Sequence, residues 1–143
     1  MMNKQKVLFV CIHNSARSQM AEGFLNDLGK DRFEAESAGI EAGTLNPRAV
    51  QVMRELGIDI SHHYAKEAST LIQQGKEYDY VITVCDAKNS ARCPVFPGAV
   101  KRQAWMFDDP SSATGTEEEK LILTRRVRDE IKEAVMQFVK NVQ

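Results

Sequence analysis

A cysteine and an arginine lie six residues apart, where a short apolar run gives way to a helical pattern. The run extends from Val7 to Cys11 and is followed by the residues Ile-His-Asn-Ser-Ala and then Arg17. A tight loop between a strand and a helix can turn successive backbone N–H groups inward and cradle a tetrahedral oxyanion. The helix N-terminus adds roughly half a positive charge, and the planar guanidinium matches two oxygens of such an ion. This spacing therefore predicts an oxyanion site.

The same loop also suits nucleophilic chemistry at sulfur. A thiol beside an arginine at a helix N-terminus is favoured as the thiolate, which is the attacking species. One loop could thus hold an anion and supply the group that attacks it. The alternative is a purely structural loop in which Arg17 forms a salt bridge, and the strand–loop–helix context favours the oxyanion site.

Two more cysteines follow later in the chain. Cys85 ends another apolar run, and Cys93 lies eight residues beyond it. Three cysteines are too few, and odd in number, for a disulfide scaffold. They could be small buried hydrophobic residues, or redox-active thiols in a compartment that otherwise keeps thiols reduced. Because the start of the chain is polar and its first apolar run is too short for a signal peptide or a membrane span, we expect a cytoplasmic protein.

Length and charge narrow the possible partners. The chain has 143 residues, which fits one domain over 1–143. Apolar residues make up 43% and charged residues 27%, and the formal net charge is −1. This balance gives no electrostatic case for binding nucleic acid or an anionic membrane. Any anion must be held by a local site.

Apolar runs alternate with helical patterns along the chain. Strands are expected at 7–11, 33–37, 78–84 and 100–105, and helices at 18–28, 47–56, 65–74 and from 117 onward. Asn46 is expected to cap the second helix and Gly57 to end it, while Thr116 to Glu119 form a capping box. This order predicts an α/β fold with a four-stranded parallel sheet flanked by helices on both faces. Because ligands bind at the carboxyl ends of such strands, Cys11 and Cys85 could share one site.

The segment 11–23, CIHNSARSQMAEG, resembles the signature loop of the low-molecular-weight protein tyrosine phosphatases. Its second half, 18–23, is similar specifically to the thioredoxin-coupled arsenate reductases built on that fold. The likeness continues through five more segments, at 37–42, 45–47, 57–61, 107–110 and 115–120. It covers nearly the whole chain. The resemblance implies the low-molecular-weight phosphatase fold.

The resemblance also implies roles for individual residues. Cys11 would be the nucleophile, and Ser18 would hydrogen-bond its sulfur, although a serine there could be only a helix cap. Asp109 would be the general acid that protonates the leaving oxygen, although Asp-Asp-Pro also suits a turn. The substrate oxyanion would be bound by the loop residues Ile12, His13, Asn14, Ser15, Ala16 and Arg17.

Two activities begin with this chemistry and then diverge. A phosphatase hydrolyses the Cys11 phosphoenzyme with water and needs no other thiol. An arsenate reductase needs two electrons, and the resemblance implies that Cys85 attacks Cys11 and that Cys93 passes the disulfide to thioredoxin. The three thiols equal what this relay requires, and Cys93 favours thioredoxin over glutathione. Arsenate reduction is therefore the favoured function, with phosphate and sulfate as competing oxyanions and phosphatase activity as the alternative.

The residues after the acid agree with a small inorganic substrate. Tyrosine phosphatases of this fold usually carry aromatic residues there, whereas Ser111 and Ser112 offer no stacking surface. A third hypothesis is an oxyanion-binding or redox-sensing protein without turnover. Arg17 and Asp109 count against it, since a sensor needs no acid for a leaving group.

The loop departs from the family pattern twice. His13 stands where glycine is usual, so either that backbone position is less demanding here or the loop is reshaped. Ala16 replaces a second loop cysteine of many relatives, which is not part of the relay.

No metal or other cofactor is expected. Three residues match positions that line a monovalent cation site in some relatives, namely Asn14, Glu22 and Ser37. A fourth such position is Lys66, whose ammonium could replace the ion. His62 and His63 are expected to be solvated loop residues, since no further ligand lies at metal-binding spacing.

Overall fold

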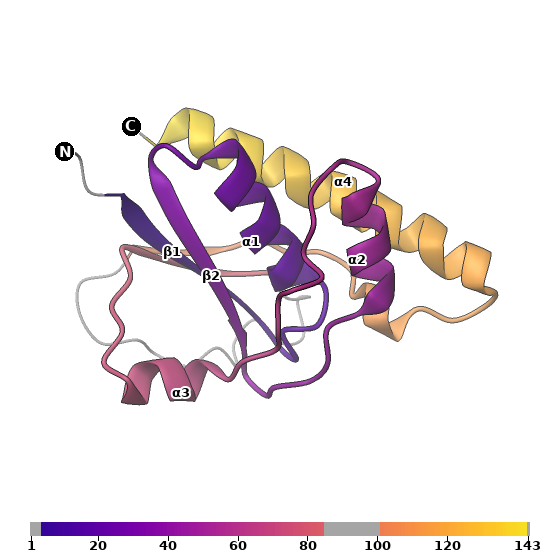
Figure 1. The fold of residues 1–143 in the computed structure, drawn as a ribbon, viewed down its shortest axis with the longest axis horizontal. Helices are drawn as coiled ribbons and strands as arrows, with labels where there is room; N and C mark the ends of the chain where they lie inside the picture. Colours follow the sequence, from indigo (N-terminus) through magenta and orange to yellow (C-terminus); the bar gives the residue numbers. More distant parts are fainter. Residues whose placement is uncertain (1–3, 85–100, 143) are drawn as a thin grey trace.

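A computed structural model describes residues 4–84 and 101–142 and contains a four-stranded parallel sheet in the order β2-β1-β3-β4 (Figure 1). The strands are β1 (Gln5–Cys11), β2 (Phe33–Gly39), β3 (Tyr80–Thr83) and β4 (Lys101–Ala104). The helices are α1 (Arg17–Leu28), α2 (Pro47–Arg54), α3 (Ala68–Gln73), the 3₁₀ turn η2 (Pro110–Ser112) and α4 (Glu117–Asn141). The predicted fold class is confirmed.

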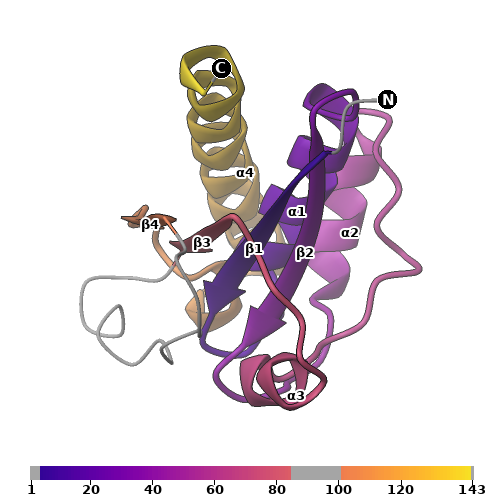
Figure 2. The same cartoon turned by 90° about the vertical axis from the view of Figure 1, so that its left-hand side faces the viewer.

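Strand β1 is covered on both faces, as its continuous apolar run predicts. Val7 and Phe9 join a core cluster with buried residues of α1, α2 and α4, whereas Leu8 and Val10 join a smaller cluster with residues of α3. Figure 2 shows α1, α2 and α4 on one side of the sheet and α3 on the other. All four of these strand residues have no exposed surface. The end of β1, where Cys11 lies, is therefore held rigidly by two cores.

The helix boundaries follow the capping signals in the sequence. The Asn46 side chain accepts a hydrogen bond from the Arg48 N–H, and Thr116 forms the expected capping box. After α2, the Ile58 N–H donates to the Met53 carbonyl and Gly57 has a φ of +79°, a left-handed closure that glycine adopts without steric cost. The predicted starts of α2 and α4, and the end at Gly57, are confirmed.

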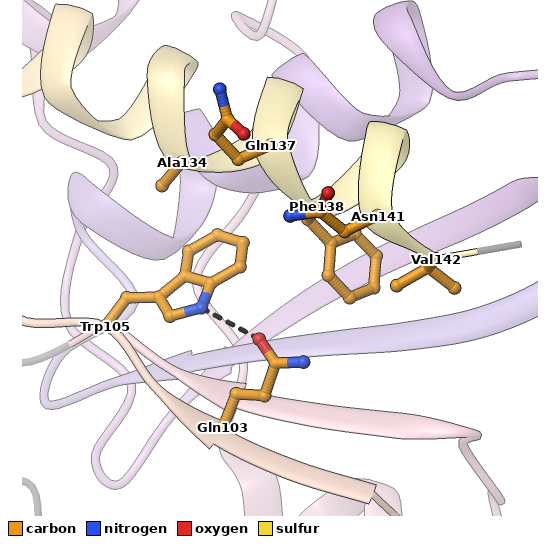
Figure 3. A pocket seen from close by; sticks show the side chains of 7 residues that line it. All are labelled: Gln103, Trp105, Ala134, Gln137, Phe138, Asn141 and Val142. Atoms are coloured by element: carbon orange, nitrogen blue, oxygen red, sulfur yellow. Dashed lines mark hydrogen bonds between the residues drawn. The ribbon is translucent and has the colours of Figure 1, made fainter.

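The residue after β4, Trp105, packs against the end of α4 through aromatic contacts. The Trp105 ring lies 5.7 Å from the Phe9 ring and 5.9 Å from the Phe138 ring. Beside them is a pocket of about 310 Å³, lined also by the amide side chains of Gln103 and Gln137 (Figure 3). Within the described ranges, no helix has the length and apolar character needed to cross a bilayer.

Candidate active site in the loop after the first strand

The loop between β1 and α1 has its carbonyl oxygens anchored by neighbouring segments. Each carbonyl from residue 11 to residue 16 accepts a hydrogen bond, and the donors are the N–H groups of Ile40, Glu41, Gly43, Asn46 and Met20 and the side chain of Gln19. Since these oxygens would repel an anion, their engagement by other segments leaves N–H groups to line the loop. The N-cap Ala16 has no side-chain oxygen, and the first turn of α1 carries no acidic residue. The start of α1 is thus open to an anionic ligand.

The Cys11 sulfur is buried among hydrogen-bond donors. Cys11 is 3% exposed, and its sulfur lies 2.9 Å from the Ser18 hydroxyl and 3.2 Å from the Asn14 nitrogen. The Asn14 side-chain amide donates to the same hydroxyl at 2.7 Å, so that oxygen is an acceptor on this side. The hydroxyl proton of Ser18 is then free to point at the Cys11 sulfur. Two hydrogen-bonding groups, the Ser18 hydroxyl and the Asn14 N–H, are thus directed at one sulfur.

Arg17 opens α1 and reaches a segment ninety residues further along the chain. Its side chain is 3% exposed, and one Nη donates to the Phe107 carbonyl at 3.1 Å while the other lies 3.5 Å from an Asp109 carboxylate oxygen. The guanidinium is therefore buried, paired and fixed at the same end of the sheet as the loop.

Asp109 forms the expected turn and also contacts Arg17. As a turn residue it caps η2, accepting from the Ser111 N–H at 2.9 Å and from the Ser112 hydroxyl at 3.1 Å. It also lies beside the Arg17 guanidinium. The structure therefore brings Cys11, Arg17, Ser18 and Asp109 together at one site, from two stretches of chain that lie about ninety residues apart.

Two polar residues of this site were not predicted as members of it. The Ser111 hydroxyl lies 3.1 Å from the Ser15 hydroxyl and accepts a hydrogen bond from the Asn46 side chain at 2.9 Å. Asn46 was predicted only as a helix cap, and it performs that task with its other side-chain atom. These bonds tie the segment after Asp109 to the oxyanion loop.

The two departures in the loop fit its backbone. Among the described residues other than glycine, the only positive φ is that of Asn14, at +54°. His13 has no such conformation, so glycine is not required at position 13. The His13 side chain is half exposed, 3.8 Å from Glu41, while Ala16 is buried in the core.

The residues behind the loop differ from what was expected. The Lys66 ammonium lies 3.4 Å from the Tyr64 carbonyl and over the Tyr64 ring. His63 is the side chain that faces Glu22, with Nε2 3.4 Å from the carboxylate, and Ser37 donates to the other carboxylate oxygen at 2.6 Å. The prediction of a solvated His63 is therefore wrong, because its side chain is only 9% exposed.

Burial controls the protonation of this pair. Removal from water raises the pKa of Glu22 above its usual range and lowers the pKa of His63 to about 4. At neutral pH the imidazole is therefore neutral. Among the residues that the structure describes, no group of three metal-ligating side chains occurs.

Cys85 and Cys93 lie outside the described residues. The described chain approaches the first of them through Val84, whose N–H donates to the Val10 carbonyl at 2.9 Å. Val84 precedes Cys85, and Val10 precedes Cys11.

Comparison with known proteins identifies relatives along the whole chain. The sequence model of the low molecular weight phosphotyrosine protein phosphatase family matches residues 6–143. An arsenate reductase of Bacillus licheniformis is 49% identical over 140 residues, covering 96% of each chain, and one of Bacillus subtilis is 46% identical with the same coverage. A solved arsenate reductase in the phosphate-binding state superposes with a TM-score of 0.77 at 32% identity, covering 97% of this chain and 99% of the other. A tyrosine phosphatase of Erwinia amylovora, 20% identical with a TM-score of 0.76, shares the fold.

Gly39 should be essential to the loop because the Asn14 backbone packs directly against it. A Cβ at Gly39 would lie 2.8 Å from the Asn14 nitrogen and 2.5 Å from the Glu41 carbonyl. We expect Gly39→Ala to cost about 1–3 kcal/mol of unfolding free energy and to weaken phosphate binding, measured by urea denaturation and calorimetry. Gly75→Ala is the control, since its strained φ of +74° is remote from the loop and should affect stability alone. Unchanged phosphate affinity in Gly39→Ala would show that the loop tolerates the added atom.

His63 should make the protein less stable in mild acid. Its pKa is 6.5 in an unfolded chain and about 4 in the fold, so between these values the unfolded state binds more protons. The free energy of unfolding should therefore fall by about 2 kcal/mol from pH 7 to pH 5 because of this residue.

The variant His63→Phe should lack that part of the pH dependence in urea denaturation at the two pH values. Because Glu22 lies 3.4 Å from His63 and contributes with the opposite sign, the comparison is made in a Glu22→Gln background. His62→Phe, at the neighbouring exposed ring, should keep the wild-type slope. An unaltered slope in His63→Phe would contradict the assignment.

Proposed function

The chain belongs to the low molecular weight phosphotyrosine protein phosphatase family, and from that premise we propose that it reduces arsenate to arsenite with electrons from thioredoxin. The observation that carries the proposal is the oxyanion loop around a buried sulfur that faces two hydrogen-bond donors. The full-length relatives named arsenate reductases, up to 49% identical, support arsenate as the substrate. Phosphate and sulfate, which share the tetrahedral shape, would compete.

The first step would be an in-line attack of the Cys11 thiolate on arsenic. Arg17 and the loop N–H groups would stabilise the equatorial oxygens, with the charge developing in a largely desolvated site. Asp109, protonated, would donate its proton so that the departing oxygen leaves as water. Its position 3.5 Å from the Arg17 guanidinium supports this role.

The second step would transfer the two electrons. The Cys85 thiolate would attack the Cys11 sulfur, the sulfur–arsenic bond would break, and arsenic would leave with the electron pair as arsenite. Cys93 would then attack Cys85 and release the Cys11 thiolate, and the dithiol of thioredoxin would reduce the Cys85–Cys93 disulfide. Such a relay needs a compartment that keeps thiols reduced, which supports a cytoplasmic location. It requires no metal or other cofactor.

Phosphatase activity is the second candidate, because the family match and the first chemical step suit it equally. The described residues next to Asp109 favour the reductase. Ser111 and Ser112 are short, and their hydroxyl groups are hydrogen-bonded to Ser15 and Asp109. They offer no flat apolar surface on which an aryl phosphate could stack.

Parallel assays of the full chain distinguish arsenate reduction from phosphatase activity. We expect arsenite formation from arsenate with thioredoxin, thioredoxin reductase and NADPH, and little hydrolysis of an aryl phosphate. Cys11→Ser should abolish both activities. Efficient aryl phosphate hydrolysis without arsenite would overturn the proposal in favour of the phosphatase.

Cys93→Ser should release one equivalent of arsenite per enzyme and then stop. Cys11 and Cys85 alone supply two electrons, but their disulfide would involve the buried Cys11 sulfur, which a protein reductant reaches poorly. Arsenite yield and peptide mass spectrometry of the disulfide provide the measurement. Cys85→Ser is the matched control, and it should release no arsenite. Sustained turnover of Cys93→Ser with thioredoxin would exclude Cys93 from the relay.

A further inference from the structure

Gln19, in the first turn of α1, is a fully buried carboxamide with all of its main hydrogen-bonding groups engaged. Its Nε2 donates to the Asn14 carbonyl and to the Tyr64 carbonyl, both at 3.0 Å. Its Oε1 lies 2.9 Å from Nδ1 of His63. A buried side chain with three such partners has one orientation, because a flipped amide would place its oxygen against two carbonyls.

This orientation fixes the tautomer of His63. Since both N–H groups of the amide are donated elsewhere, its oxygen must accept, and Nδ1 of the imidazole must carry the proton. His63 therefore orients Gln19, and Gln19 in turn holds Asn14.

Asn14 is the residue of the loop that most needs such support. It adopts a left-handed φ of +54°, and its N–H lies 3.2 Å from the Cys11 sulfur. Its side chain is held at both ends, donating to the Ser18 hydroxyl and accepting from the Lys66 N–H. Its carbonyl is held by Gln19 alone among the recorded bonds of the described residues.

We infer that Gln19 is a positioning residue of the oxyanion loop: oriented by His63, it holds the Asn14 carbonyl outward and keeps the loop in the conformation that stabilises the Cys11 thiolate. Without this bond, rotation of the 14–15 peptide would turn a carbonyl oxygen toward the anion and displace the Ser15 N–H. The Asn14 N–H would also lose its fixed direction toward sulfur. Gln19 touches neither the substrate nor the sulfur, and it acts through the loop backbone.

The test is the pH dependence of Cys11 alkylation by iodoacetamide in the full chain, followed on the Cys11 peptide by mass spectrometry. Gln19→Met keeps the length of the side chain and removes every hydrogen bond. We expect its midpoint to rise by about one pH unit, which is about tenfold less thiolate below the midpoint. Inorganic phosphate should protect Cys11 from alkylation less well than in the wild type.

His63→Phe is the second variant, because it leaves Gln19 in place and removes the group that orients it. This variant should also raise the midpoint of the Cys11 alkylation profile. If Gln19→Met does not fold, His63→Phe alone tests whether Gln19 positions the loop. Gln51→Met, at an exposed position on α2, is the matched control and should leave the alkylation profile unchanged.

A wild-type profile and wild-type phosphate protection in both variants would overturn the inference. So would lower thermal stability with an unshifted profile, since that would show a structural role only. The inference rests on the proposed function only in taking Cys11 as the reacting thiolate. Because the readout is alkylation and phosphate protection, its failure can be distinguished from a failure to reduce arsenate.

Discussion

The site depends on the outward anchoring of six consecutive carbonyl groups, from residue 11 to residue 16. In a tight loop, N–H groups can converge on an anion only if the intervening carbonyls find partners elsewhere, since a buried carbonyl without a partner costs about 1–3 kcal/mol. The partners come from the segment after β2, the first turn of α1 and the start of α2. Three elements of the fold must therefore meet at the end of β1 before the loop can bind anything.

A buried positive charge is the second constraint. The Arg17 guanidinium is almost fully removed from water, which is costly unless its donors are used. It uses them on the Phe107 carbonyl and on Asp109, and so it determines where this distant segment lies. The same contact that satisfies Arg17 brings a carboxyl group to the mouth of the oxyanion loop. The contacts that stabilise the buried Arg17 therefore also hold residues 107–109 in the position that the proposed chemistry needs.

Whether a feature could be predicted from the sequence depends on how far apart along the chain its interacting residues lie. Strands, helix caps and the Cys11–Arg17 loop depend on neighbours within about seven residues, and their patterns predicted them correctly. The bonds of Ser111 to Asn46 and Ser15 join residues 65 and 96 positions apart. Asn46 shows that one side chain can satisfy a local pattern and also bind a remote residue. His63 was predicted wrongly because the sequence near it offers no ligand or partner, whereas its partner Gln19 lies 44 residues away along the chain. Only the packing of the chain against α1 shows that one ring points inward.

His13 illustrates how the backbone, rather than residue type, sets the requirement at a loop position. The left-handed conformation falls on Asn14, and asparagine tolerates it better than most residues do. The space that the loop needs near residue 13 comes instead from glycines of the facing segment. A Cβ at Gly39 would lie 2.8 Å from the His13 carbonyl carbon, and one at Gly43 would lie 3.0 Å from the His13 Cβ. The side chain at position 13 therefore extends toward solvent beside Glu41, and the backbone of the loop needs no glycine there.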